Sequence, residues 1–314
     1  MSDHKNKHPE EQELMDGDPD TTGHSWDGIK EFNNPLPRWW LWTFYATIVW
    51  GVIYTVLYPA WPLVNSATPG ILGFSTREDV AEDIERFDAM NADLRSQITE
   101  VELAAINPED NPDLYNYAIQ GGDAVFATWC SQCHGSGAAG VQAAGYPNLL
   151  DDAWLWGGSI EEIRYTVAHG IRNEDDIDAR YSEMTAFDGI LSDEEIGQVV
   201  NYVMSLSDDD GDGVNPAGHD YDAQLASAGE SVYLNNCAAC HMDNGTGDAF
   251  LGAPNLTDAI WLYGGDAETV EETVRYSRFG VMPPWSSEAS SAGRLSEAEV
   301  RAVAVYVHSL GGGE

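Results

Sequence analysis

The sequence repeats itself from about residue 112 onward, and this repeat limits the possible folds more than any other feature. The pattern Cys-x-x-Cys-His occurs at 130–134 and again at 237–241. At the same spacing, further elements of the first copy recur in the second, among them Pro-Asn-Leu, a tryptophan and a Gly-Gly pair. Such an internal repeat indicates two homologous domains. We place them at 112–207 and 223–314, joined by an acidic linker over 208–222.

Each copy is predicted to be small, helical and rich in loops. A capping box marks the start of the last helix in both copies, with Ser192 and Glu195 in the first and Ser296 and Glu299 in the second. Apolar residues then follow at the spacing i, i+3, i+4, i+7, which is typical of one helix face. A short helical segment also precedes each cysteine pair. The predicted fold class is therefore mainly α.

The Cys-x-x-Cys-His pattern is the attachment motif of c-type haem, in which two thiols add across the haem vinyl groups and the histidine binds iron. A zinc site or a thioredoxin-like redox pair is the alternative. Zinc needs four ligands where each motif supplies three, and a redox pair needs no following histidine. We therefore predict two covalently attached haem c groups. The predicted haem-binding residues are Cys130, Cys133 and His134 in the first copy and Cys237, Cys240 and His241 in the second.

A second iron ligand is expected in each copy. The methionines that could supply it are distinguished by their positions in the sequence. Met184 lies in a loop before the last helix of the first copy, and Met282 occupies the same kind of loop in the second. Met204 falls inside a helix, while Met242 adjoins the proximal histidine and cannot reach the opposite haem face. We assign Met184 to the first haem and Met282 to the second.

Two histidines are rival ligands to these methionines. His169 has no counterpart in the second copy, where Tyr276 aligns with it, and His308 lies in a helix near the C-terminus. The methionines are therefore preferred.

One stretch, from Trp39 to Tyr58, carries no charged residue. At a rise of ~1.5 Å per residue, a helix of this length spans the ~30 Å hydrocarbon core of a bilayer. Aromatic residues gather at both ends, as they do at membrane interfaces. A buried helix of a soluble domain and a cleavable signal sequence are the alternatives. We predict a transmembrane helix over 36–62.

Basic residues set the expected orientation of this helix. Lys5, Lys7, Lys30 and Arg38 precede it, and the next basic residue is Arg77, so the positive-inside bias predicts a cytoplasmic N-terminus. The segments on either side differ in pattern. We expect a mostly disordered tail over 1–35 and a connector with amphipathic helices over 63–111.

The charge of the chain is extreme, with 53 acidic and 14 basic residues and a net charge of −39. A nucleic-acid binder needs a basic surface to displace counterions from phosphate, so this function class is excluded. The acidic surface can steer a basic donor protein or reflect adaptation to a salty exterior. The absence of lysine after residue 30 favours adaptation to salt. In such surroundings electrostatic steering would be screened, because at ~1 M salt the Debye length is ~3 Å.

The acidic linker partly resembles a calcium-binding loop. Asp208, Asp210 and Asp212 stand at positions 1, 3 and 5, and Gly213 at position 6. Position 12 is His219, so no bidentate glutamate closes the coordination shell. We favour a solvated linker, with calcium binding as the alternative.

The segments around the apolar stretch carry a resemblance to a known family. Trp-Asp-Gly-Ile begins at residue 26, Asn-Pro-Leu-Pro-Arg-Trp-Trp-Leu-Trp runs over 34–42, and Tyr-Val-His-Ser-Leu-Gly-Gly ends the chain at 306–312. With one span and two haem motifs, the sequence resembles the di-haem subunit of cbb3-type cytochrome c oxidases, the CcoP or FixP family. The family has Met-Pro in the first loop, whereas Thr185 follows Met184 here. The resemblance implies one N-terminal transmembrane helix followed by two tandem cytochrome c domains.

The resemblance also implies a function and partners. It predicts a subunit of the bacterial inner membrane, with periplasmic haem domains, that takes electrons from a donor cytochrome c. The electrons pass to a mono-haem cytochrome c subunit and a catalytic haem–copper subunit, which performs the oxygen and proton chemistry, so the chain is no enzyme by itself. An anchored di-haem cytochrome serving another complex is the alternative. A di-haem peroxidase is a further one, but it needs an open iron position that two loop methionines would fill.

Overall fold

The structure is a computed structural model that describes residues 20–27, 29–208 and 211–313. It divides into two compact units, Met1–Asp88 and Ala89–Glu314, which are described separately. Most of the predicted tail lies outside the described residues.

The first unit contains a hairpin and two helices. Strands β1 (Thr21–Trp26) and β2 (Ile29–Phe32) pair antiparallel. Helix α1 (Arg38–Leu57) follows Pro37, which has no N–H to leave unsatisfied at the helix start, and α2 is Thr76–Met90.

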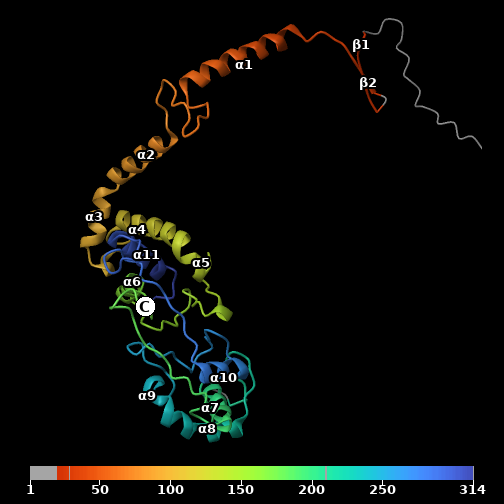
Figure 1. The fold of residues 1–314 in the computed structure, drawn as a ribbon. Helices are drawn as coiled ribbons and strands as arrows, with labels where there is room; N and C mark the ends of the chain where they lie inside the picture. The colour runs from red at the N-terminus through yellow and green to blue at the C-terminus, as the bar shows by residue number, and fades with distance from the viewer. Residues whose placement is uncertain (1–19, 28, 209–210, 314) are drawn as a thin grey trace, which may run out of the picture. The chain divides into compact units, whose positions relative to one another are not determined.

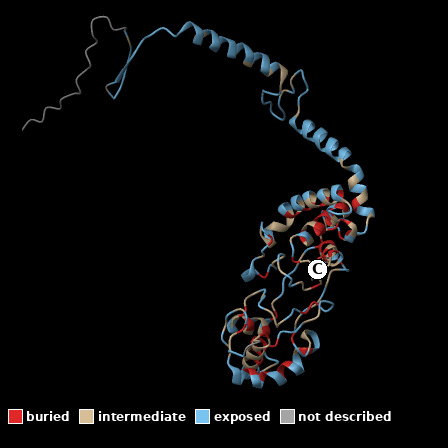
Figure 2. Cartoon of the chain, turned by 180° about the vertical axis from the view of Figure 1, so that it is seen from behind, coloured by how far each residue is buried: buried red, intermediate tan, exposed pale blue. Residues whose placement is uncertain are grey.

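Helix α1 is the predicted membrane-spanning segment. It has 20 residues, an 18-residue window of the helix has a mean hydropathy of 1.4, and none of its residues is buried within the protein. Figure 2 shows this helix exposed along its length. An apolar helix that buries none of its residues has the length and composition needed to cross a bilayer.

The second unit is helical with long loops (Figure 1). Its α-helices are α3 (Ala92–Glu100), α4 (Pro112–Val125), α5 (Ser131–His134), α6 (Ile160–His169), α7 (Asp193–Ser205), α8 (Ala223–Asn236), α9 (Ala238–His241), α10 (Ala267–Tyr276) and α11 (Glu297–Ser309). Shorter helical turns are η1 (Leu103–Ala105), η2 (Phe126–Cys130) and η3 (Gln142–Ala144). Both predicted capping boxes are present, at the starts of α7 and α11. This confirms the mainly helical fold.

The last helices of the two repeats are exchanged. Helix α7, from the first repeat, packs against α8 and α10 of the second, while α11 packs against α4 and α6 of the first. The domain bounds predicted from the sequence, 112–207 and 223–314, include each last helix with its own repeat. We call the body formed by α4, α6 and α11 the Cys130 core, and the body formed by α8, α10 and α7 the Cys237 core.

Two separate clusters of buried apolar side chains show the same exchange. In the Cys130 core, Ile163 and Val167 of α6 pack with Val300, Val303 and Val307 of α11. In the Cys237 core, the cluster joins apolar residues of α8 and α10 to those of α7. These residues are Val232, Tyr233, Val270, Val274, Ile196, Val199, Val200 and Val203. Each core is therefore completed by the other repeat.

The exchange requires the chain to cross between the cores twice. Residues 170–192 lead from α6 to α7, and residues 277–296 lead from α10 to α11. At the crossing, Ile171 and Met282 pair antiparallel through two backbone hydrogen bonds of 2.9 and 3.0 Å. We call these two stretches the crossover segments.

A further set of contacts joins the cores at equivalent positions. Gly145 lies against the ring of Tyr263, and Gly252 lies against the ring of Trp156. Because Gly145 and Gly252 occupy the same place in the two repeats, as do Trp156 and Tyr263, the interface has an approximate two-fold symmetry. The cores are thereby held in a defined mutual arrangement.

Glycine permits the close approach of the exchanged helices. A Cβ at Gly122 in α4 would overlap the carbonyl of Ala302 in α11, and a Cβ at Gly229 in α8 would overlap the carbonyl of Gln198 in α7. The neighbouring Gly121 faces only the Ala302 Cβ at 3.8 Å, an ordinary contact. The two glycines of α4 thus differ in the space around them.

Replacing Gly122 with Ala should therefore destabilise the protein by about 1–3 kcal/mol, since the added methyl group would overlap the backbone of α11 and displace this helix. Gly121→Ala is the matched control, and it should be neutral or stabilising by up to about 1 kcal/mol because alanine favours the helix. Thermal unfolding of the haem-loaded chain measures both. Equal stability of the two variants would contradict the packing of α11 on α4.

Candidate haem sites

Each Cys-x-x-Cys-His motif lies at the end of a helix that leads into it. In the first repeat, α4 continues through η2 into α5, and in the second, α8 leads directly into α9. The first cysteine of each pair is partly buried and the second is exposed, in both repeats. Burial raises the pKa of Cys130 and of Cys237 to about 11, with a smaller effect of the second cysteine. These groups are therefore thiols at neutral pH, the form that adds across a vinyl group.

The histidine of each motif is oriented for metal binding. The Nδ1 of His134 lies 3.2 Å from the carbonyl oxygen of Pro147, and the Nδ1 of His241 lies 3.1 Å from that of Pro254. When Nδ1–H donates to this carbonyl, Nε2 carries the lone pair that can bind iron. Burial lowers the pKa of both histidines, which favours the neutral ligand form. The Pro-Asn-Leu repeats therefore serve to hold the histidines.

The loop methionines lie in the cores opposite to those expected. Met282 packs on the apolar cluster of the Cys130 core, together with Cys130 and Trp154. Met184 packs on the cluster of the Cys237 core, together with Cys237. The sequence assigned each methionine to the cysteine pair of its own repeat, whereas the structure packs each methionine on the apolar cluster that holds a cysteine of the other repeat. The physical reason is the helix exchange, which takes each loop to the other core.

Both cores fit a c-type haem by the character of their side chains. Each offers two cysteines, an oriented histidine, a thioether and aliphatic side chains. In addition, the indole N–H groups of Trp156 and Trp261 are buried without a hydrogen-bond partner in the described residues. A buried donor is costly unless it is paired. A haem carboxylate would be a suitable acceptor for either indole. No sequence pattern pointed to these two residues, because an isolated tryptophan carries no motif.

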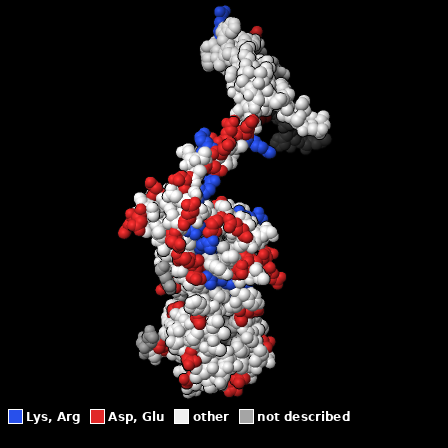
Figure 3. Space-filling model, turned by 90° about the vertical axis from the view of Figure 1, so that its left-hand side faces the viewer, with Lys and Arg blue, Asp and Glu red and all other residues white. Residues whose placement is uncertain are grey.

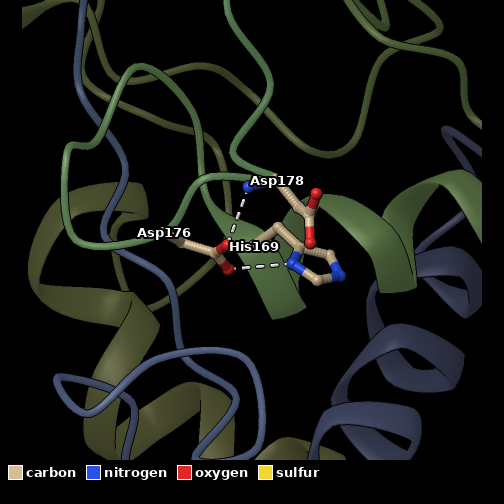
Figure 4. A group of neighbouring side chains, drawn as sticks. All are labelled: His169, Asp176 and Asp178. Carbon is tan, nitrogen blue, oxygen red and sulfur yellow. Dashed lines mark hydrogen bonds and ion pairs between the residues drawn. The ribbon is translucent and has the colours of Figure 1, made fainter.

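The rival histidines have other surroundings. The Nδ1 of His169 lies 2.8 Å from the carboxylate of Asp176, which also accepts a hydrogen bond from the backbone N–H of Asp178 (Figure 4). His308 lines a cavity of about 380 Å³ together with Leu103.

Comparisons with known proteins place both Cys-x-x-Cys-His motifs within cytochrome c domains. The family model described as the N-terminal domain of cytochrome oxidase-cbb3, FixP, matches residues 18–65, and the cytochrome c model matches residues 119–207 and 226–311. The cbb3-type cytochrome c oxidase subunit CcoP of Cereibacter sphaeroides is 59% identical over 300 residues, which cover 95% of this chain and 97% of that protein. The chain belongs to the CcoP/FixP family. The subunit FixP of Azorhizobium caulinodans is 48% identical, with 95% of each chain covered.

Membership in the CcoP/FixP family confirms several predictions from the sequence. The two cytochrome c domains are matched directly, and they imply covalent attachment of c-type haem. The chain is an electron-transfer subunit, and α1 falls within the family's N-terminal domain, in agreement with a membrane anchor.

The acidic linker of this CcoP/FixP chain uses its carboxylates to fold itself. Asp208 accepts hydrogen bonds from the N–H groups of Gly211 and Gly213 at 2.8 and 3.0 Å, and from the hydroxyl of Tyr221 at 2.5 Å. Asp212 accepts one from Val214. These bonds satisfy the carboxylates of Asp208 and Asp212 with the chain's own donors. The solvated linker stays the prediction and calcium binding its alternative.

Acidic side chains form scattered patches on the surface shown in Figure 3. Several arginines are distributed among them as partners. Arg164 pairs with Glu297 at 2.6 Å, and Arg275 pairs with Asp193 at 2.8 Å and with Glu271 at 2.7 Å. Two of these contacts join different repeats, so the few cations of the chain reinforce the exchanged arrangement.

Proposed function

We propose that this chain carries two c-type haems and relays electrons through them to the catalytic haem–copper subunit of a cbb3-type oxidase. The observation that carries the proposal is the pair of Cys-x-x-Cys-His motifs, each with a histidine whose Nδ1 is bound by a proline carbonyl. A bound c-type haem supplies one-electron redox chemistry. The protein's part is to attach it, orient its ligands and exclude water.

We assign the iron ligands across the repeats. The haem joined to Cys130 and Cys133 takes His134 and Met282, since Met282 packs in the Cys130 core. The haem joined to Cys237 and Cys240 takes His241 and Met184, since Met184 packs in the Cys237 core. A thioether is a soft ligand that favours ferrous iron and raises the reduction potential, which suits a carrier that accepts electrons from a cytochrome.

The interface between the cores supports direct transfer between the two sites. The symmetric contacts of Gly145 with Tyr263 and of Gly252 with Trp156 fix one core against the other. Gln142 adds a hydrogen bond of 2.7 Å to the carbonyl of Trp261. Because these contacts fix the distance between the two haem sites, they also fix the rate of electron transfer between the sites.

The partners and location follow from family membership and charge. We propose an inner-membrane subunit with a cytoplasmic N-terminus, because Lys30 and Arg38 lie on the N-terminal side of the apolar part of α1. The haem cores then lie in the periplasm. A donor cytochrome c delivers electrons there, and a mono-haem cytochrome c subunit of the same oxidase receives them. Catalysis of oxygen reduction and proton transport belongs to the haem–copper subunit.

The ligand assignment predicts the effect of removing one thioether. Met282→Ala should abolish the near-infrared sulfur-to-iron band of the haem at Cys130 and lower its potential, and that ferrous haem should bind carbon monoxide. Met184→Ala should do the same to the haem at Cys237. Absorption spectra and redox titration of the full chain measure these changes.

The two haems can be told apart in a Cys130→Ala background. The haem at this site then keeps one vinyl group in conjugation, and its absorption bands move to longer wavelength. In this background Met282→Ala should open the shifted haem to carbon monoxide. If the unshifted haem opens instead, the ligands are not crossed and each repeat binds its own methionine.

The oxidase assignment predicts which cofactors copurify with the chain from the membrane. Extraction from native membranes in a mild detergent should bring down b-type haem and copper with this subunit. The purified chain alone should exchange electrons with cytochrome c and consume no oxygen. Recovery with c-type haem only, in several mild detergents, would favour an anchored cytochrome that serves another complex.

A further inference from the structure

The loops that carry the two methionines meet on either side of one short stretch, Gly170–Arg172. On one side, Ile171 exchanges backbone hydrogen bonds of 2.9 and 3.0 Å with Met282. On the other side, the N–H of Arg172 donates to the carbonyl of Arg180 at 2.7 Å, and the N–H of Arg180 donates to Gly170 at 3.1 Å. Arg180 lies in the loop that carries Met184. This stretch therefore contacts both methionine loops through its backbone.

The side chain of Arg172 repeats this double contact. Its Nε donates to the carbonyl of Ser182, and its Nη1 donates to the carbonyl of Gly280 at 3.2 Å. Ser182 lies two residues before Met184, and Gly280 lies two residues before Met282. One guanidinium thus binds the same position of both loops. It also lies 5.5 Å from the ring centre of Phe279, in the second loop.

The backbone of Arg172 indicates that this placement is constrained. Its φ of 53° lies in the left-handed region, which costs free energy for a residue with a Cβ and persists where the surroundings determine it. Burial lowers the pKa of Arg172, and the nearby Tyr263 and Glu183 act in the opposite direction. An arginine stays charged under such conditions, and its planar fork donates to two acceptors at once, which lysine cannot match.

We propose that Arg172 is a positioning residue that holds both distal methionines against their irons and so couples the ligation of the two haems. The proposal rests on the crossed ligand pairs proposed above. Because one side chain binds both loops, its loss should loosen both methionines together. A residue that stabilised one core alone would affect one haem.

Arg164 provides a matched control. It also joins the two repeats, since its Nε and Nη2 lie 2.9 and 2.6 Å from the carboxylate of Glu297 at the start of α11. This pair contacts neither methionine loop in the described hydrogen bonds and ion pairs. Arg164→Leu therefore removes an ion pair between the repeats and leaves every hydrogen bond of the Arg172 side chain to the methionine loops in place.

The experiment measures carbon monoxide binding to the reduced full chain in detergent, in the Cys130→Ala background that separates the two haems. Carbon monoxide enters when the methionine leaves the iron. Arg172→Leu should raise the rate of binding at least tenfold at both haems and weaken both sulfur-to-iron bands. Arg172→Lys keeps the charge without the fork and should show the same rise, and it serves if the leucine variant does not fold. Arg164→Leu should leave both rates near those of the parent.

Three results would overturn the proposal: a rise at one haem only, no rise at either haem, or an equal rise in Arg164→Leu. Wild-type behaviour of Arg172→Lys would also overturn it, because charge alone would then suffice. The Met184→Ala and Met282→Ala variants separate this failure from that of the ligand assignment. If those variants open the crossed haems and Arg172→Leu opens neither, the ligand assignment stands and the coupling through Arg172 fails.

Discussion

The antiparallel pairing of Ile171 with Met282 is the contact on which the rest of the second unit depends. It joins the crossover segments at the point where each repeat gives up its last helix to the other. Beyond this point α11 packs on the Cys130 core and α7 on the Cys237 core. The methionine in the loop before each helix packs in the same core as that helix. The proposed ligand pairs therefore depend on the exchange of the helices.

This arrangement makes the two haem sites interdependent. A cytochrome domain that packed its own last helix could fold and bind haem alone, whereas here each apolar cluster is incomplete without the other repeat. The interface adds the reciprocal contacts of Gly145 and Gly252 and ion pairs such as that of Arg164 with Glu297. In a chain with a net charge of −39, such pairs offset part of the repulsion between acidic side chains. The benefit for an electron carrier is a fixed geometry between its two redox centres.

The sequence predicts local features well, because each of them depends on a short pattern of neighbouring residues. The cysteines and histidines of the attachment motif, the capping boxes at Ser192 and Ser296 and the apolar span of α1 are all local patterns. The exchange is not local. Helices α7 and α11 carry the same apolar spacing and face an equivalent glycine, so either fits either core, and the pattern cannot say which is chosen. For this reason the sequence pairs each methionine with its own repeat, whereas the structure packs it in the other core. A lone arginine such as Arg172, outside any motif, gives no signal in the sequence.

The most direct test of the crossed arrangement is an experimental structure of the haem-loaded chain within its membrane complex, at a resolution that shows side chains. The account predicts the sulfur of Met282 on the iron of the haem bonded to Cys130 and Cys133, with α11 packed on α4. It likewise predicts the sulfur of Met184 on the iron of the haem bonded to Cys237 and Cys240. Density that joins Met184 to the first haem and Met282 to the second would contradict it.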